Sequence, residues 1–210
     1  FLASRKDILY AMPEAALPAE LVLLYASIAL ELVATGPLTQ IVRIVAEERR
    51  LTAGSPHPDW LEWIKRENFG PGRAAASRLR AYDTHWDMNT LGQVLQKLLQ
   101  PVLLKSPALM QLPHEEQQRL QNAIRTIATS RQYIAHLFPF PSIVEMNNAI
   151  GSAVVVLEAL RPLAADTPAV LAATDEGIDE LKRLHGVAKT AAGGGTACVK
   201  LTKSHALRLL

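Results

Sequence analysis

The sequence has little cysteine and few aromatic residues. Its 210 residues include one cysteine, Cys198, and aromatic residues make up only 5%. A single cysteine excludes an intramolecular disulfide framework and is typical of a reducing, intracellular compartment. Aromatic residues favour strands, so their scarcity in a chain rich in alanine and leucine favours helices.

The sequence also lacks a long apolar run and a strong excess of charge of one sign. Its most apolar stretch, Leu21–Leu30, lies between two glutamates and is too short to cross a bilayer. This stretch is expected to be a buried helix, and neither a signal peptide nor a membrane partner is predicted. The net charge of +2 is compatible with a nucleic-acid partner but does not require one.

Apolar residues recur at helical spacing through most of the chain, and no segment alternates like a series of strands. Prolines, glycines and capping residues mark where each predicted helix begins and ends. The predicted helices span residues 17–35, 37–50, 59–64, 87–101, 113–136, 142–160 and 174–188, with a connector over 106–112. The predicted fold class is therefore all-α, a helical bundle of about five or six helices, with the helix over 174–188 as an addition to it.

The predicted domain organisation follows from a change in the composition of the sequence beyond Ala164. Residues 1–165 are predicted to form one helical domain. Residues 166–210 are predicted to add an extra amphipathic helix, a flexible linker around Gly193–Gly195 and a basic tail. The chain begins at Phe1 instead of methionine, so we expect it to be a piece of a larger protein.

One predicted helix carries two side chains suited to acting on RNA. Arg131 and His136 lie five positions apart in the helical segment that begins at Pro113. Arginine binds a phosphate through a planar fork and keeps its charge, whereas histidine can move a proton near neutral pH. These are the side chains that metal-independent RNA cleavage needs.

The spacing by itself leaves other roles open for this pair. Five residues of α-helix turn through roughly 500°, so the two side chains point about 140° apart. Both can border one concave surface, especially when a second helix or a second protomer closes it. Alternatively, Arg131 pairs with a carboxylate, and His136 caps the helix before the proline-rich turn at 138–141.

Residues upstream of this pair add candidate contacts to RNA. Arg78 and Arg80 belong to a short basic run, which is either a solvated face or a contact to the RNA backbone. Arg80 also begins a second Arg-x4-His pattern, ending at His85, so the pattern alone is a weak signal. Asp87 either caps the helix that follows it or orients Arg131 from a neighbouring helix.

The order of these features resembles the HEPN superfamily of helical domains. The mark of that superfamily is an arginine, a polar residue, a few further residues and then a histidine. The longer resemblance is to the HEPN-like domain at the C terminus of a PIN-type nuclear mRNA-surveillance endoribonuclease, and it covers about residues 18–164. Three blocks carry it: Tyr25–Val33 with Gly36–Leu38, Trp86–Leu95, and Ser130–His136 with the helix from Ser142.

The resemblance implies a homodimer in which the Arg-His helices of two protomers form one cleft that cleaves RNA without a metal or cofactor. Arg131 would hold the scissile phosphate, and His136 would act as acid or base on the ribose 2′-hydroxyl or the leaving oxygen. At the position of Gln132 the family often has asparagine. The second polar contact to RNA is therefore the part of the family pattern from which this chain departs. Some family members have lost activity and only bind RNA or proteins.

Three functions therefore remain open from the sequence. The first is a metal-independent endoribonuclease that acts through Arg131 and His136 in a dimer. The second is a non-catalytic module that binds RNA or other RNA-processing proteins within a larger RNA-surveillance nuclease. The third is a helical scaffold with no nucleic-acid role. The resemblance also implies an intracellular, nuclear location.

Overall fold

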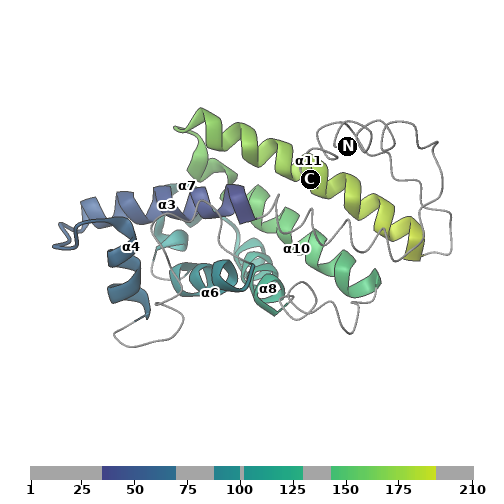
Figure 1. Ribbon diagram of the computed structural model, residues 1–210, viewed down its shortest axis with the longest axis horizontal. Coiled ribbons are helices and arrows are strands. Elements are labelled where there is room, and N and C mark those ends of the chain that lie inside the picture. The colour runs from purple at the N-terminus through teal and green to yellow at the C-terminus, as the bar shows by residue number, and fades with distance from the viewer. Residues whose placement is uncertain (1–34, 70–87, 100–101, 130–142, 193–210) are drawn as a thin grey trace, which may run out of the picture.

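The computed structural model describes residues 35–69, 88–99, 102–129 and 143–192. Within these ranges the chain is 86% helical, with seven α-helices and no strand. The prediction of an all-α helical bundle is therefore confirmed for the described residues (Figure 1). The α-helices are α3 (Thr35–Thr52), α4 (Trp60–Trp63), α6 (Met88–Leu99), α7 (Pro107–Met110), α8 (His114–Thr129), α10 (Ile143–Leu160) and α11 (Pro168–Ala192).

The first described helix, α3, has an apolar stripe at helical spacing. Its buried apolar side chains are Leu38, Ile41, Val42, Val45 and Ala46. Pro37 lies in the first turn, where the missing backbone N–H costs nothing because it has no partner within the helix. The helix predicted over 37–50 is confirmed, and in the structure it runs from Thr35 to Thr52, so it begins before the predicted break at Gly36–Pro37.

Local hydrogen bonds fix the turn between α3 and α4. Gly54 has a φ of +59°, a left-handed conformation that glycine adopts without strain. The guanidinium of Arg50 donates a hydrogen bond to the carbonyl oxygen of His57 at 3.0 Å. Asp59 caps α4 as predicted, because its carboxylate accepts from the backbone N–H of Glu62 at 2.8 Å. A π-helical segment, Ile64–Phe69, continues α4.

Helices α6 and α8 approach each other closely through two small residues. A Cβ atom on Gly92 would lie only 2.6 Å from the Cα of Ala128, so a larger residue does not fit between the two backbones. The buried residues of this pair are Leu91, Val94, Leu95 and Leu98 on α6, and Leu120, Ala123, Ile124 and Ile127 on α8. These buried residues recur at the helical spacing from which the helices over 87–101 and 113–136 are predicted.

The segment between α6 and α8 contains more helix than predicted. A 3₁₀ turn at Leu103–Lys105 precedes α7, so the predicted connector over 106–112 includes a one-turn helix. Pro107 begins α7, and Leu109 is buried in the core. Four residues are too few to show helical periodicity, which is why the sequence does not predict this helix.

The C-terminal half of the described fold is built on α10 and α11. Helix α10 packs against α8 and α11, and α11 also contacts α3 (Figure 1). Helix α11 begins at Pro168, earlier than the predicted start at Thr174. Proline is favoured in a first turn, and the amide of Val170 already bonds the carbonyl oxygen of Thr167.

Helix α11 shares the hydrophobic core with the other helices. Its buried apolar residues are Ile178, Leu181 and Leu184. A bidentate ion pair between Arg161 and Asp175 ties it to the 3₁₀ segment Arg161–Ala164 that follows α10. The predicted boundary after residue 165 stays a prediction, but the helix that follows it is part of the same packed unit. None of the described helices is both long and apolar enough to span a bilayer.

Candidate binding groove

The residues predicted to act on RNA lie outside the part of the chain that the structure describes. They are Arg78, Arg80, Asp87, Arg131, Gln132 and His136. Their predicted roles therefore stay predictions. The described helices that adjoin them in the sequence are α6, which begins at Met88, and α8, which is described up to Thr129.

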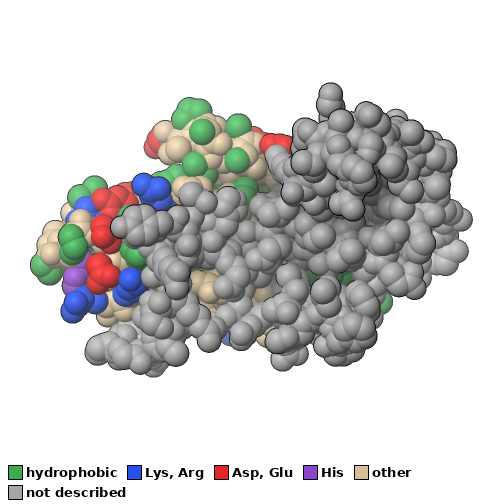
Figure 2. Space-filling model, in the orientation of Figure 1, with side chains coloured by type: hydrophobic (Ala, Val, Ile, Leu, Met, Phe, Trp, Pro, Cys, Tyr) green, Lys and Arg blue, Asp and Glu red, His purple; other side chains and the backbone are tan. Residues whose placement is uncertain are grey.

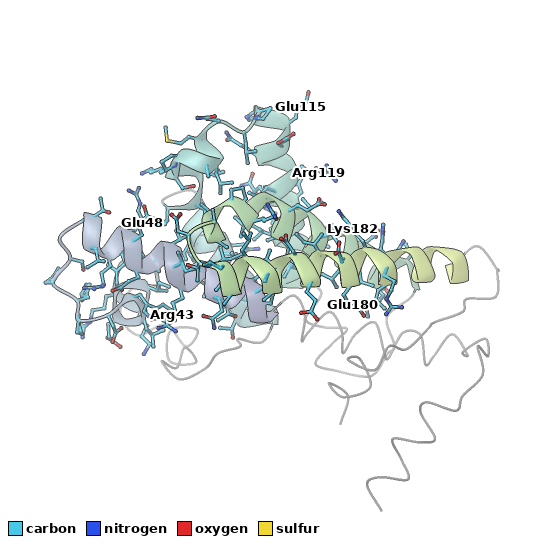
Figure 3. The ribbon with its side chains drawn as sticks, turned by 90° about the horizontal axis from the view of Figure 1, so that it is seen from above. Arg43, Glu48, Glu115, Arg119, Glu180 and Lys182 are labelled. Carbon is cyan, nitrogen blue, oxygen red and sulfur yellow. The ribbon has the colours of Figure 1, made fainter. Side chains whose placement is uncertain are left out.

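A groove of about 1020 Å³, lined by polar residues together with Ala123, Val154 and Val155, lies along α8, α10 and α11. Helix α10 packs against both α8 and α11 and so lies between them. Glu115 and Arg119 of α8 and Lys182 of α11 lie on the same side of the molecule, whereas Glu180 lies on the opposite side of α11 (Figure 3). The lining side chains include Gln118, Asn122 and Thr126 from α8, Asn147, Asn148, Gly151, Ser152 and Glu158 from α10, and His185 from α11.

Helical periodicity explains why these side chains share one surface. On α8 the groove residues Glu115, Gln118, Asn122 and Thr126 recur every three or four positions, which keeps them on one face of the helix. The buried stripe that includes Leu120 recurs at the same spacing but on another face. The same sequence pattern therefore packs α8 into the core and points amide and hydroxyl groups into the groove.

Among the described residues that line the groove, the formal charges sum to zero when the imidazoles are neutral. Its two cationic side chains, Arg119 and Lys182, are balanced by the carboxylates of Glu115 and Glu158. The Nζ atom of Lys182 lies 2.7 Å from Oε1 of Glu158, and this hydrogen bond raises the pKa of Lys182 above its usual range. One of the two cations is therefore already engaged with a carboxylate of the groove.

One buried acceptor in the groove has no donor. The Oδ1 atom of Asn147 is buried without a hydrogen-bond partner, the one such side-chain atom found among the described residues. A buried polar atom left unpaired costs on the order of 1–3 kcal/mol. This unpaired amide oxygen is therefore a small cost to the stability of the folded chain.

The histidine of α11 lies close above a glycine of α10. A Cβ atom on Gly151 would lie 3.4 Å from Nε2 of His185, which is van der Waals contact with the imidazole. The groove thus combines amides, hydroxyls and imidazoles, which can both donate and accept hydrogen bonds.

The charged end of the molecule formed by α3 and α4 is a second polar surface. Acidic and basic side chains are intermixed there (Figure 2). Arg50 pairs with Glu47 at 2.6 Å, and this hydrogen bond lowers the pKa of the Glu47 carboxyl. Paired charges of both signs do not form the basic patch that binds nucleic acid. Across the described residues, no group of three or more His, Cys, Asp or Glu side chains is placed to hold a metal ion.

The sequence does not predict the groove. Its lining residues belong to amphipathic helices and most of them are polar, and they have the same spacing whether they face a groove or open solvent. Only the packing of α10 between α8 and α11 brings them together. The single signal in the sequence is the cluster of amides Asn147 and Asn148 early in an otherwise apolar helix.

Comparison of the chain with protein-family models, with curated proteins and with solved structures finds no match. The function is therefore inferred from the residues of this chain alone.

Proposed function

We propose that the chain is an RNA-associated helical domain of HEPN type that cleaves single-stranded RNA without a metal through Arg131 and His136. The observation that carries the proposal is α8. This helix has Glu115 and Glu116 in its first turn, buries Leu120, Ala123, Ile124 and Ile127, and is described up to Thr129. It supports the predicted helix over 113–136 as far as Thr129, whereas the block Ser130–His136 lies outside the described residues.

The proposed chemistry divides between the two side chains. The guanidinium of Arg131 binds the phosphate and stabilises the charge that develops on it. The imidazole of His136 takes a proton from the ribose 2′-hydroxyl or gives one to the leaving oxygen. The two side chains of one helix point about 140° apart. The HEPN resemblance implies a dimer, and we propose that in this dimer a second copy of the pair completes the site.

Substitution of the proposed acid–base residue tests this function. We expect His136→Ala to reduce RNA cleavage by about 10²–10⁴-fold, the usual contribution of general acid–base catalysis. Replacement of another histidine, His114→Ala, is the matched control because His114 is an exposed residue at the start of α8. Equal activity of the two variants would contradict the proposed role of His136.

A second candidate function is a non-catalytic module that binds RNA or a protein partner. The observation that favours it is the groove along α8, α10 and α11, which lies within the described residues and presents hydrogen-bonding groups. For RNA as the partner, charge reversal at Arg78 and Arg80 should weaken binding and reduce its dependence on salt, as measured by fluorescence anisotropy at several salt concentrations. Unchanged affinity and salt dependence would exclude these arginines as phosphate contacts.

A further inference from the structure

We propose that Thr52 is a phosphorylation site for an arginine-directed serine/threonine protein kinase. This modification is separate from the proposed RNA cleavage and does not depend on Arg131 or His136. Three observations lead to it: the two arginines that precede Thr52, the exposure of Thr52 at the end of α3, and the ease with which the turn that holds it can open.

The residues before Thr52 carry the charge pattern that such kinases recognise. Arg49 and Arg50 lie three and two positions before the threonine, and no other serine or threonine of the 210-residue chain has arginine at both positions. Arginine-directed kinases select a substrate through carboxylates that pair with these two side chains. The sequence before Thr52 therefore supplies both of the charges that such a kinase binds.

The hydroxyl of Thr52 lies at the surface. Thr52 is the last residue of α3, at the end of the molecule where the chain turns into α4 (Figure 1). The four residues Leu51–Gly54 are all exposed. The Oγ1 atom of Thr52 donates a hydrogen bond to the backbone carbonyl oxygen of Glu48 at 2.8 Å, so it is bonded within its own helix and is not part of the core.

The last turn of α3 can open without loss of core packing. Transfer requires the Thr52 hydroxyl to lie in line with the phosphate in the cleft of the kinase, so this turn must unwind. The turn is closed by two hydrogen bonds of 3.1 Å, from the amide of Gly54 to Leu51 and from the amide of Ser55 to Arg50. Hydrogen bonds at an exposed helix end open readily. Leu51 is already 63% exposed, so unwinding removes little apolar surface from the core.

The contacts of Arg50 are ones that a kinase can replace. Its guanidinium donates to the carboxylate of Glu47 at 2.6 Å and to the carbonyl oxygen of His57 at 3.0 Å. The Glu47 side chain is 38% exposed, and solvent weakens a pair of this kind. The carboxylates of the kinase therefore take over the partner of Arg50 when the turn opens.

The proposed reaction is a phosphoryl transfer from ATP. The Oγ1 atom of Thr52 forms a bond to the γ-phosphorus, and the bond between that phosphorus and the oxygen it shares with the β-phosphate breaks. ADP leaves with the electron pair of the broken bond, and the proton of the threonine hydroxyl passes to a carboxylate base of the kinase.

Incubation of the folded 210-residue chain with ATP, Mg²⁺ and the catalytic subunit of cyclic-AMP-dependent protein kinase, an arginine-directed enzyme, tests the proposal. We expect the intact mass to show one phosphate per chain, and fragmentation to place it on Thr52. Thr52→Ala should remove it. Thr129 is the control within the chain, because it is also exposed and bonded to a carbonyl oxygen of its own helix, but Thr126 and Ile127 stand at the positions of the two arginines. It should stay unmodified.

Two variants test the recognition of the arginines. Arg49→Gln should lower the kcat/KM of phosphorylation by about tenfold or more, because one of the two charges is lost. Arg43→Gln removes an exposed arginine of the same helix that lies outside the pattern, and it should leave the rate unchanged. Circular dichroism shows whether both variants keep the helicity of the wild type. Equal rates for Arg49→Gln and the wild type would overturn the proposed recognition.

A synthetic peptide of residues 46–55 separates the sequence pattern from its accessibility in the folded chain. Phosphorylation of the peptide but not of the folded chain would overturn the proposal, because the turn would then not open in the native protein. A phosphate on Thr129 in place of Thr52 would overturn it as well. Because these readouts measure phosphate incorporation and not RNA cleavage, their failure can be distinguished from failure of the proposed ribonuclease activity.

Discussion

Two glycines on the described helices, Gly92 and Gly186, differ in the space that a side chain would have. A Cβ atom on Gly92 would meet the Cα of Ala128 at 2.6 Å, whereas nothing lies within 4 Å of a Cβ atom on Gly186. Alanine has the higher helix propensity at both positions, by about 1 kcal/mol. The difference between the two sites therefore comes from packing alone.

We expect Gly92→Ala to destabilise the protein and Gly186→Ala to stabilise it. Overpacking at the crossing of α6 and α8 should cost about 1–3 kcal/mol and outweigh the gain in propensity. Gly186→Ala should raise the free energy of unfolding by up to about 1 kcal/mol. Urea unfolding measures both values. A Gly92→Ala variant as stable as Gly186→Ala would show that the two helices do not approach each other as closely as described.

The ion pair between Glu47 and Arg50 gives stability a specific dependence on pH. The hydrogen bond from Arg50 lowers the pKa of Glu47 below its usual value of 4.5. The native state therefore holds the charged carboxylate more strongly than the unfolded chain does. The stabilisation is complete above pH 4.5 and is lost as the pH falls through the lowered pKa of the folded state.

Glu47→Gln should accordingly be less stable than the wild type at pH 7, and the difference should shrink as the pH is lowered below 4.5. The effect should be small, because the Glu47 side chain is 38% exposed and solvent screens the pair. Urea midpoints over a pH series measure it, and Glu48→Gln is the control at an exposed position of the same helix. A destabilisation that does not vary with pH would exclude the ion pair as its cause.

At the scale of elements, the sequence predicts the longer described helices and the short α4, but it misses α7. Helices α3, α6, α8 and α10 each repeat apolar residues often enough for their periodicity to be recognised. Helix α7 has a single turn, and its start depends on Pro107 and a preceding 3₁₀ turn. The early start of α11 is missed because Pro168–Ala173 has no clear polar face.

Helix α11 should contribute to the stability of the whole described bundle. Leu181 is fully buried where α11 enters the core, so Leu181→Ala should cost about 2–5 kcal/mol. Trp60 and Trp63 lie on α4, on another element, and provide a separate probe of unfolding. We expect the midpoints from tryptophan fluorescence and from circular dichroism to shift by equal amounts.

The control for this prediction is Asp179→Ala, an exposed change on the same helix that should alter stability by less than about 0.5 kcal/mol. A Leu181→Ala variant that shifts the circular dichroism transition but leaves the tryptophan transition unchanged would mean that α11 unfolds on its own. That result would support a structural boundary near residue 165.

At the scale of the whole molecule, the sequence predicts the all-α class but not the groove. The class follows from composition and periodicity, which are local properties. The groove depends on which polar faces come together when α10 packs between α8 and α11, and this is a property of tertiary packing. Asn147 illustrates the difference, since its sequence context does not reveal that its amide oxygen is buried without a donor.

The proposed function belongs to the same scale, because it requires two chains and one RNA strand. Its most direct test is cleavage of a labelled single-stranded RNA in EDTA, at a concentration where light scattering gives the mass of a dimer. We expect the wild type to cleave the RNA and to leave a DNA strand of the same sequence intact, because DNA has no 2′-hydroxyl to attack the phosphate. His136→Ala should lose cleavage and keep its mass and helicity. Cleavage that persists in His136→Ala, that appears only with Mg²⁺, or that is absent from the wild-type dimer would contradict the proposed function.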